Sequence, residues 1–166
     1  MPLEQDLARI ALQEERLQFQ TFDAETAWRL GVRLREAAAA RGLSVAIDIQ
    51  LAGQALFFTS MPGTTPDNAD WVRRKRNVVL LYRRSSYAVG LKLKLEGTTL
   101  AERQGLDARD YAPHGGCFPI LLRGAGCVGA ITVSGLPQRQ DHELIVEILA
   151  EQLGLPVAEV ALGPED

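Results

Sequence analysis

Two short apolar runs that flank a glycine-rich turn constrain the fold of this chain more than any other feature. The runs lie within residues 117–133, and the turn is expected near residues 123–125. Such segments pair as an antiparallel hairpin, because a short turn returns the second strand beside the first. An earlier hairpin is predicted from an alternating strand at 44–51, a tight turn at Gly53–Gln54 and a returning strand at 56–61.

The strand predicted at 44–51 has one apolar face and one face that carries Asp48 and Gln50. This alternation is typical of a half-buried strand. Apolar residues at helical spacing, capping residues and helix-ending glycines predict helices in the rest of the chain. They cover residues 3–18, 23–41, 65–84, 85–97 and the segment from Pro137 to about residue 153.

The connections between these elements indicate the fold class. Residues 98–112 are expected to be a turn-rich connection, and residues 155–166 an extended or flexible tail. Hairpins rather than crossovers indicate an α+β fold, with an antiparallel sheet of two hairpins flanked by helices. A chain of 166 residues is most simply a single domain, 1–166, with the first helix, within 1–20, at its periphery.

The two cysteines are not expected to form a disulfide. Antiparallel counting places Cys117 opposite about residue 132 and Cys127 opposite about residue 122, so the two sulfurs do not face each other. The chain does not begin like a secretory signal, and no apolar run approaches the roughly 20 residues that span a bilayer. We therefore expect a cytoplasmic protein without a membrane partner.

The charges are distributed unevenly along the chain. Residues 71–95 hold eight basic residues and no acidic one, against ten basic and 21 acidic residues elsewhere. The eight are Arg73, Arg74, Lys75, Arg76, Arg83, Arg84, Lys92 and Lys94. Projection of one helix through this region gives an arginine stripe, opposite an apolar face, that could hold a carboxylated ligand or a neighbouring subunit. The overall acidity and the lack of an aromatic stacking platform argue against nucleic acid.

Residues 114–117 and Ser134–Gly135 are the candidate site. His114 could bind a metal or a haem iron, or act as an acid or base; alternatively, it hydrogen-bonds the turn or packs at a subunit interface. Gly115, Gly116 and Gly135 could turn backbone N–H groups toward an anion, or relieve crowding where the backbone packs closely.

Two further residues near this region have competing interpretations. Cys117 is either a nucleophile activated by His114 or a small core residue. His142, at a predicted helix start, is expected in a surface polar cluster, with a metal-ligand role as the alternative.

Several segments together resemble the haem-degrading-domain (GlcG/HbpS-like) family, and most closely its uncharacterised bacterial and fungal branch. They are Trp71–Asn77, Arg84–Ala88, His114–Ile120, Gly129–Pro137 and Gln140–His142. The resemblance implies a profilin-like sandwich and a homo-oligomer of dimers assembled into a ring-like particle. It also implies a ligand, since some members bind or degrade haem and others are linked to small organic acids.

The leading hypothesis is a small-ligand-binding protein for haem or a small carboxylated molecule. Its pocket would lie between His114, Gly115, Gly116 and Cys117, the Ser134–Gly135 end, and Arg73 and Arg76. His114 would bind the iron, and Arg73 or Arg76 a propionate. One alternative is a homo-oligomeric scaffold that binds proteins without chemistry. Another is a metal-dependent enzyme, which needs Asp110 or His142 beside His114 as a second ligand.

Overall fold

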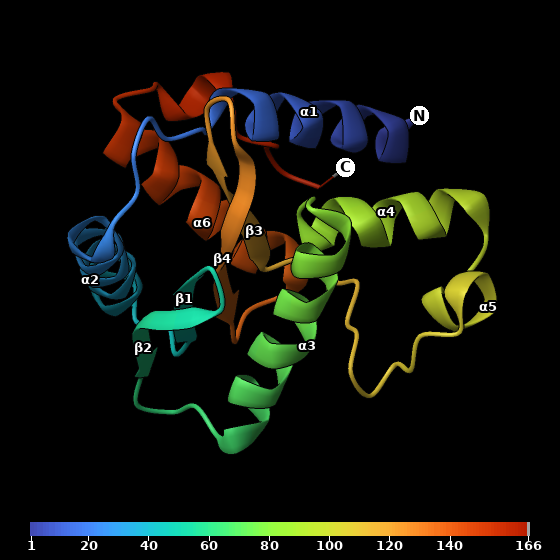
Figure 1. The fold of residues 1–166 in the computed structure, drawn as a ribbon, viewed down its shortest axis with the longest axis horizontal. Coiled ribbons are helices and arrows are strands. Elements are labelled where there is room, and N and C mark those ends of the chain that lie inside the picture. The colour runs from blue at the N-terminus through green and yellow to red at the C-terminus, as the bar shows by residue number, and fades with distance from the viewer. Residues whose placement is uncertain (166) are drawn as a thin grey trace.

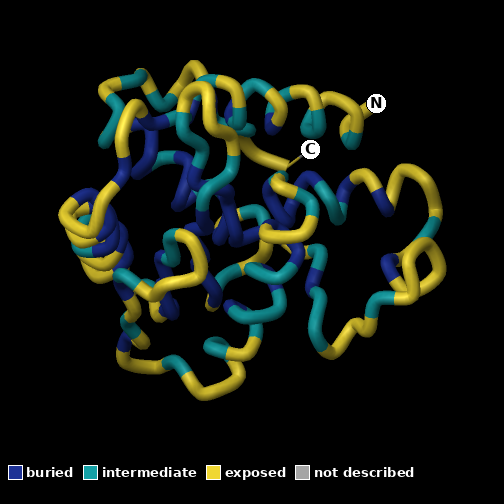
Figure 2. Tube along the Cα trace, in the orientation of Figure 1, coloured by how far each residue is buried: buried dark blue, intermediate teal, exposed yellow. Residues whose placement is uncertain are grey.

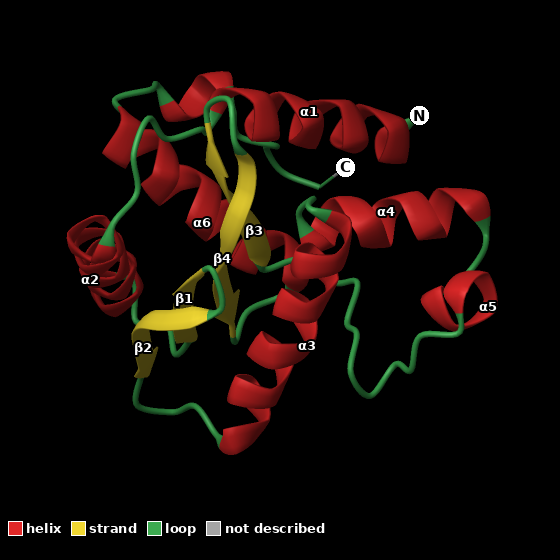
Figure 3. Cartoon of the chain, viewed as in Figure 1, coloured by secondary structure: helices red, strands yellow, loops and turns green. Residues whose placement is uncertain are grey.

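A four-stranded antiparallel sheet forms the centre of the computed structural model, which describes residues 1–165 (Figure 1). Its strands, in the spatial order β2-β1-β4-β3, are β1 (Ala46–Leu51), β2 (Gln54–Ser60), β3 (Cys117–Leu122) and β4 (Gly126–Ser134). Each predicted hairpin is present, and the two join through antiparallel pairing of β1 with β4. The α+β prediction is confirmed, with helices around the sheet (Figure 3).

The register of the second hairpin matches the prediction at one end and differs from it by one residue at the other. Cys117 pairs with Thr132, as counted from the sequence, and Cys127 pairs with Leu121, one residue from the expected position of about 122. The difference arises because the register shifts between Ile120 and Leu121, and a bulge of this kind sets two residues against one.

Six α-helices surround the sheet within residues 1–165. They are α1 (Pro2–Arg16), α2 (Ala24–Ala40), α3 (Pro66–Tyr82), α4 (Ser86–Glu96), α5 (Leu100–Gln104) and α6 (Gln138–Leu153). The prediction of a purely turn-rich connection at 98–112 is wrong, because α5 lies within it. The Thr99 side chain caps this short helix by accepting a hydrogen bond from the amide of Glu102, and Gly105 ends the helix in the left-handed conformation.

The basic segment is not one continuous helix. Arg83 adopts a left-handed conformation (φ 57°) that ends α3, and Ser85 then caps α4 by accepting the amide of Ala88. The projection of a single arginine stripe therefore fails beyond Tyr82. Arg84 instead reaches back to Glu14 on α1, with Nη2 3.0 Å from Oε2.

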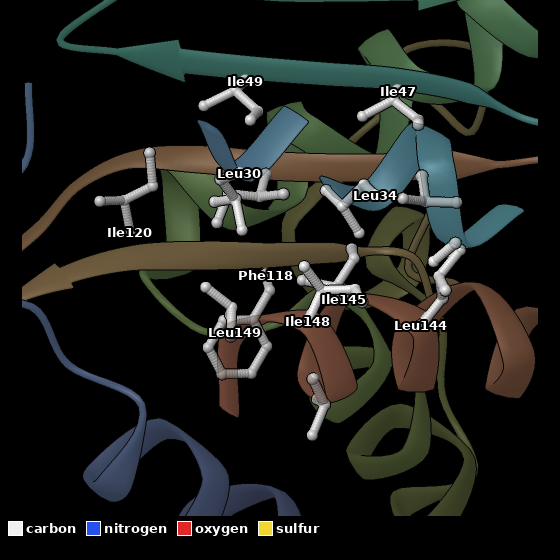
Figure 4. Close-up of a cluster of buried hydrophobic side chains, with 14 of the residues drawn as sticks. Leu30, Leu34, Ile47, Ile49, Phe118, Ile120, Leu144, Ile145, Ile148 and Leu149 are labelled. Carbon is white, nitrogen blue, oxygen red and sulfur yellow. The ribbon is translucent and has the colours of Figure 1, made fainter. Parts of the chain in front are cut away.

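The main core lies on the face of the sheet that α2 and α6 cover. Figure 4 shows Leu30 and Leu34 of α2 and several α6 side chains gathered around Ile47 and Phe118. Buried residues concentrate here in the middle of the molecule, and exposed ones lie in the outer loops (Figure 2). Each such side chain stabilises the fold by about 1.5–3 kcal/mol through its burial, so this face accounts for most of the hydrophobic stabilisation.

Helix α3 covers the opposite face, where Val79 packs against Cys117 and Ala130. This face of β1 was expected to be only half-buried, yet Asp48 on it is 3% exposed. The Arg76 Nη1 atom lies 2.8 Å from Asp48 Oδ2. Burial raises the pKa of Asp48 while Arg76 lowers it, so the carboxylate is tolerated inside because a guanidinium accompanies it.

The chain's two terminal segments pack against each other. Beyond α6, a short 3-10 helix at Val157–Glu159 is followed by Val160, which is fully buried. Arg9 of α1 donates to the carbonyls of Ala158 and Ala161, and Gln13 donates to the carbonyl of Val160. Instead of an extended or flexible tail, residues 157–162 are therefore a packed element, while residue 166 lies outside the described residues. No helix within residues 1–165 combines the length and apolar character needed to cross a bilayer.

Replacing Arg76 by alanine should destabilise the protein by about 3 kcal/mol, because it leaves the Asp48 carboxylate buried without a partner. Arg73 provides the matched control, since its ion pairs with Asp70 and Asp110 are exposed. Its replacement by alanine should cost less than about 1 kcal/mol. Urea unfolding of both variants measures the difference, and equal losses would contradict this account of Asp48.

Candidate functional site

His114 lies on the loop between α5 and β3, and this loop is fastened to α3. The amide of Ala112 donates to the carbonyl of Arg74 at 3.1 Å, and Asn77 Nδ2 donates to the carbonyl of Asp110 at 2.8 Å. The His114 ring packs edge-on against Trp71, with ring centroids 5.7 Å apart. These contacts hold the imidazole in a defined position although it belongs to a loop.

The imidazole of His114 is neutral at neutral pH. Burial lowers its pKa, and the nearby cations Lys75 and Arg74 lower it further. A neutral imidazole keeps a nitrogen lone pair, which is the form that binds a metal or a haem iron.

His114 borders a hollow of about 780 Å³, here called the main cavity. It is enclosed by the start of α1, α4, α5, the loop before β3, the start of α6 and the tail, which runs between α1 and α4 in Figure 1. Its lining combines apolar side chains with many polar and charged ones. The apolar side chains include Leu3, Leu91, Leu100, Leu106 and Leu162, and the polar ones include Arg9, Tyr87, Tyr111, His114 and Arg139.

A second hollow of about 320 Å³, the small pocket, lies on the other side of His114. It is lined by polar and apolar groups from α3, the loop before β3, the end of β4 and the start of α6, and the polar side chains are the ones that matter for binding. They include Asn68, Lys75, His114, Ser134, Gln138 and Asp141. Because His114 and Gln138 line both hollows, the two are neighbours.

A buried ion pair forms one wall of the small pocket. Lys75 Nζ lies 3.0 Å from Asp141 Oδ2, and their side chains are 5% and 2% exposed. The Asp141 carboxylate also accepts hydrogen bonds from the backbone amides of Gly135 and Leu136, with N···O distances of 3.4 and 3.0 Å. Burial raises the pKa of Asp141 to about 6, although Lys75 and the two amides act to lower it. The pair fixes the β4–α6 loop against α3.

Of the residues predicted to form the site, His114, Ser134 and Gly135 come together around the small pocket. Gly115 lies beside them and donates its amide to Gln138 Oε1 at 3.0 Å. Gly116 has a φ of 131°, and a Cβ there would come 2.6 Å from Lys75 Nζ. Close packing therefore explains this glycine better than anion binding does.

Cys117 does not line either hollow and is completely buried in β3. Burial raises the pKa of its thiol to about 12, and the thiol accepts a hydrogen bond from Thr132 Oγ1 at 3.1 Å. A thiol in this state is protonated and out of reach of a substrate, so the core interpretation holds and the nucleophile interpretation does not.

Arg73 and Arg76 do not line either hollow, because each is engaged elsewhere. Arg73 pairs with Asp70 and Asp110, and Arg76 pairs with Asp48. Much of the charge asymmetry of residues 71–95 is thus neutralised within the chain. The cations on the main cavity are Arg9, Lys94 and Arg139 instead. Sequence analysis missed Arg139, although its place two residues before Asp141, at a predicted helix start, could have drawn attention to it.

His142 is buried rather than part of a surface polar cluster, and this prediction is wrong. Its Nε2 lies 2.7 Å from Gln13 Oε1, and its ring lies between those of Tyr87 and Phe118. Helix α6 turns this position toward α1 and the sheet. Since Asp110 pairs with Arg73, neither proposed second ligand joins His114. Within residues 1–165 no cluster of three or more His, Cys, Asp or Glu side chains could hold a metal ion.

Comparison with known proteins adds an independent finding. The family model described as haem degrading protein HbpS-like matches residues 22–150. The chain is 63% identical over 162 residues to a UPF0303 protein of Azotobacter vinelandii, which covers 98% of both chains. It is 56% identical over 164 residues to one of Rhizobium etli, which covers 99% of both.

Solved structures share the fold. The structure of Ybr137w superposes with a TM-score of 0.81 at 33% identity, over 87% of this chain and 86% of that one. HbpS itself superposes with a TM-score of 0.63 at 22% identity, over 82% and 93%. A PduOC–haem complex does so with a TM-score of 0.64 at 16% identity, over 82% and 98%.

Acidification should destabilise the protein through His142. Burial lowers its folded-state pKa to about 3, below the 6.5 of an exposed histidine. The unfolded state therefore takes up the proton first, so this stabilisation is complete above pH 6.5 and is lost as the pH falls toward 3. Between pH 7 and pH 5, the free energy of unfolding of the wild type should fall by about 2 kcal/mol more than that of His142→Gln. Unfolding at both pH values tests this, and a difference that stays constant with pH would refute it.

Proposed function

We propose that this chain, which belongs to the HbpS-like haem-degrading family, binds haem in the main cavity, with His114 as the iron ligand. The observation that carries the proposal is a cavity of about 780 Å³ whose wall combines leucine side chains, cations and the imidazole of His114, whose pKa is lowered by burial. The haem complex of a protein with the same fold supports it further.

The residues around the main cavity fit the chemistry of haem, which has apolar faces, an iron that takes nitrogen ligands and two carboxylates. Leucines from α4, α5 and the tail, together with Tyr87 and Tyr111, would contact the macrocycle. Arg9, Lys94 and Arg139 would face the carboxylates. Bound haem would supply redox and oxygen chemistry, while these residues bind it, orient it and exclude water.

A small carboxylated ligand in the small pocket has less support. Lys75 is the lysine on that pocket, and Asp141 already neutralises it at 3.0 Å. A carboxylate entering there would lie beside a second carboxylate, which is unfavourable.

Ferric haem added to the purified protein should shift its Soret band, and His114→Ala should abolish the shift, because the iron loses its nitrogen ligand. Absorbance titration measures both. Cys127→Ser is the control, since this partly exposed thiol is a ligand that haem could find adventitiously away from the main cavity. Loss of the shift in Cys127→Ser, or its retention in His114→Ala, would contradict the assignment.

We also propose that the protein forms a homo-oligomer in which the β2 edges of two copies pair. β2 is an edge strand, and its sequence from Gln54 to Ser60 holds no charged residue and no proline, the usual protections of an edge. Phe58 on this strand is 51% exposed, and Trp28, which packs on Phe57, is 58% exposed. The ring-like assembly of dimers and the cytoplasmic location stay predictions.

Phe58→Lys should reduce the mass of the assembly, because a charge on each copy would repel its partner across the paired edge. Native mass spectrometry measures this. Leu95→Lys is the matched control, since Leu95 is 41% exposed on α4 and its replacement should leave the mass unchanged. An unchanged assembly in Phe58→Lys would exclude this edge as the interface. A discrete oligomer that takes up no haem would favour the scaffold alternative.

A further inference from the structure

We propose that Asp6 occupies the place of a ligand carboxylate on Arg139, and that a ligand entering the main cavity displaces it. Arg139 is then the residue that recognises the ligand's carboxylate, and Asp6 is a competitor built into the chain. The inference rests on the proposed haem function and deepens it.

The contact between the two side chains has the geometry of carboxylate recognition. Arg139 Nη1 lies 2.7 Å from Asp6 Oδ2, and Nη2 lies 3.3 Å from Oδ1. This two-point arrangement is the one by which a guanidinium binds any carboxylate, including that of a ligand. Both side chains line the main cavity, and they are 11% and 22% exposed. The pair therefore lies where an acidic ligand would be bound.

Arg139 is better placed for this role than the other cations on the main cavity. Arg9 donates to the backbone carbonyls of Ala158 and Ala161, so it holds the tail in place. Lys94 is exposed to solvent, where a charge contributes little to binding. Arg139 also donates to the Gly163 carbonyl at 3.0 Å and lies 3.4 Å from the Tyr87 hydroxyl. These contacts would keep the guanidinium oriented after Asp6 leaves.

The start of α1 is attached more weakly than its end. Arg139 provides the polar side-chain contacts of Asp6, Met1 is 76% exposed, and no side chain caps the helix. The later turns are held by the buried Ile10, by Gln13 and by the ion pair between Glu14 and Arg84. Leu3 and Leu7 still pack against the cluster of Ile10, Tyr87 and Leu91, so Asp6 leaves Arg139 by rotation of its side chain while α1 stays docked.

The wall that carries Asp6 lies outside the part of the chain that matches the family model. That match covers residues 22–150 and includes Arg139, whereas α1 and the tail fall outside it. The chain therefore combines a family segment that supplies the guanidinium with a terminal helix that supplies a carboxylate for it. This arrangement lowers the affinity for any acidic ligand, because the ligand must displace the Asp6 carboxylate before it can bind the Arg139 guanidinium.

The test compares ferric protoporphyrin IX with its dimethyl ester, which has the same macrocycle and iron but no carboxylate charge. Asp6→Asn keeps the size of the side chain and removes its charge, so it should tighten binding of the free acid by about tenfold. It should change binding of the ester by less than about twofold, because the ester has no negative charge to pair with Arg139. Arg139→Gln should weaken binding of the free acid and leave the ester unaffected. The Soret titration gives all dissociation constants.

Arg16→Gln is the matched control for loosening of the wall. Arg16 pairs with Glu159 at 2.9 Å, which joins α1 to the tail away from the main cavity. This variant should bind both probes as the wild type does. Three outcomes would each overturn the proposal. Asp6→Asn could raise the affinity for the acid and the ester equally, it could leave the affinity for the acid unchanged, or Arg16→Gln could raise that affinity as much as Asp6→Asn does. If neither probe binds the wild type or Asp6→Asn, the haem function itself fails; if both bind wild type and Asp6→Asn equally, only the exchange fails.

Discussion

The arrangement of the site depends on the buried ion pair between Lys75 and Asp141. An ammonium with almost no access to water is tolerated only beside a partner, so α3 and the start of α6 must meet at one fixed point. Asp141 accepts hydrogen bonds from the amides that follow β4, and the Val133 carbonyl together with Lys75 leaves no room for a side chain at Gly116. His114, two residues before Gly116, is thereby placed between the two hollows. One electrostatic requirement thus aligns elements from three distant parts of the sequence.

Local patterns in the sequence were sufficient to predict the sheet. Alternation in β1, the turn at 123–125 and the capping residues Asp23 and Ser85 each act within a few residues, so they can be identified without the fold. The predicted α+β class follows from them. His114, Ser134 and Gly135, which were grouped from the sequence, line the same small pocket because they lie at the ends of neighbouring strands or loops.

The errors concern contacts between residues far apart in the chain. Asp48 and His142 look like surface residues in their own segments, but α3 covers Asp48, and α1, α4 and β3 enclose His142. Arg73 and Arg76 lie on one helix but have acidic partners that a helical projection cannot identify. The left-handed Arg83 is a non-glycine residue in a conformation that propensity disfavours, and the tertiary contact of Arg84 with Glu14 accompanies it. Arg139 acquires its importance only from the cavity.

The wall formed by α1 and the tail has a consequence for the order in which parts of the protein fold. One side of the cavity comes from α1 and the other from the tail beyond α6, and hydrogen bonds from Arg9 and Gln13 join these two segments, which lie far apart in the sequence. Contacts with this sequence separation form late, because a long loop must close first. The sheet and most but not all of the core can thus form while the cavity is still open, because the tail contributes Val160 to that core. A ligand present in the cell would meet an accessible apolar surface before it meets a finished site.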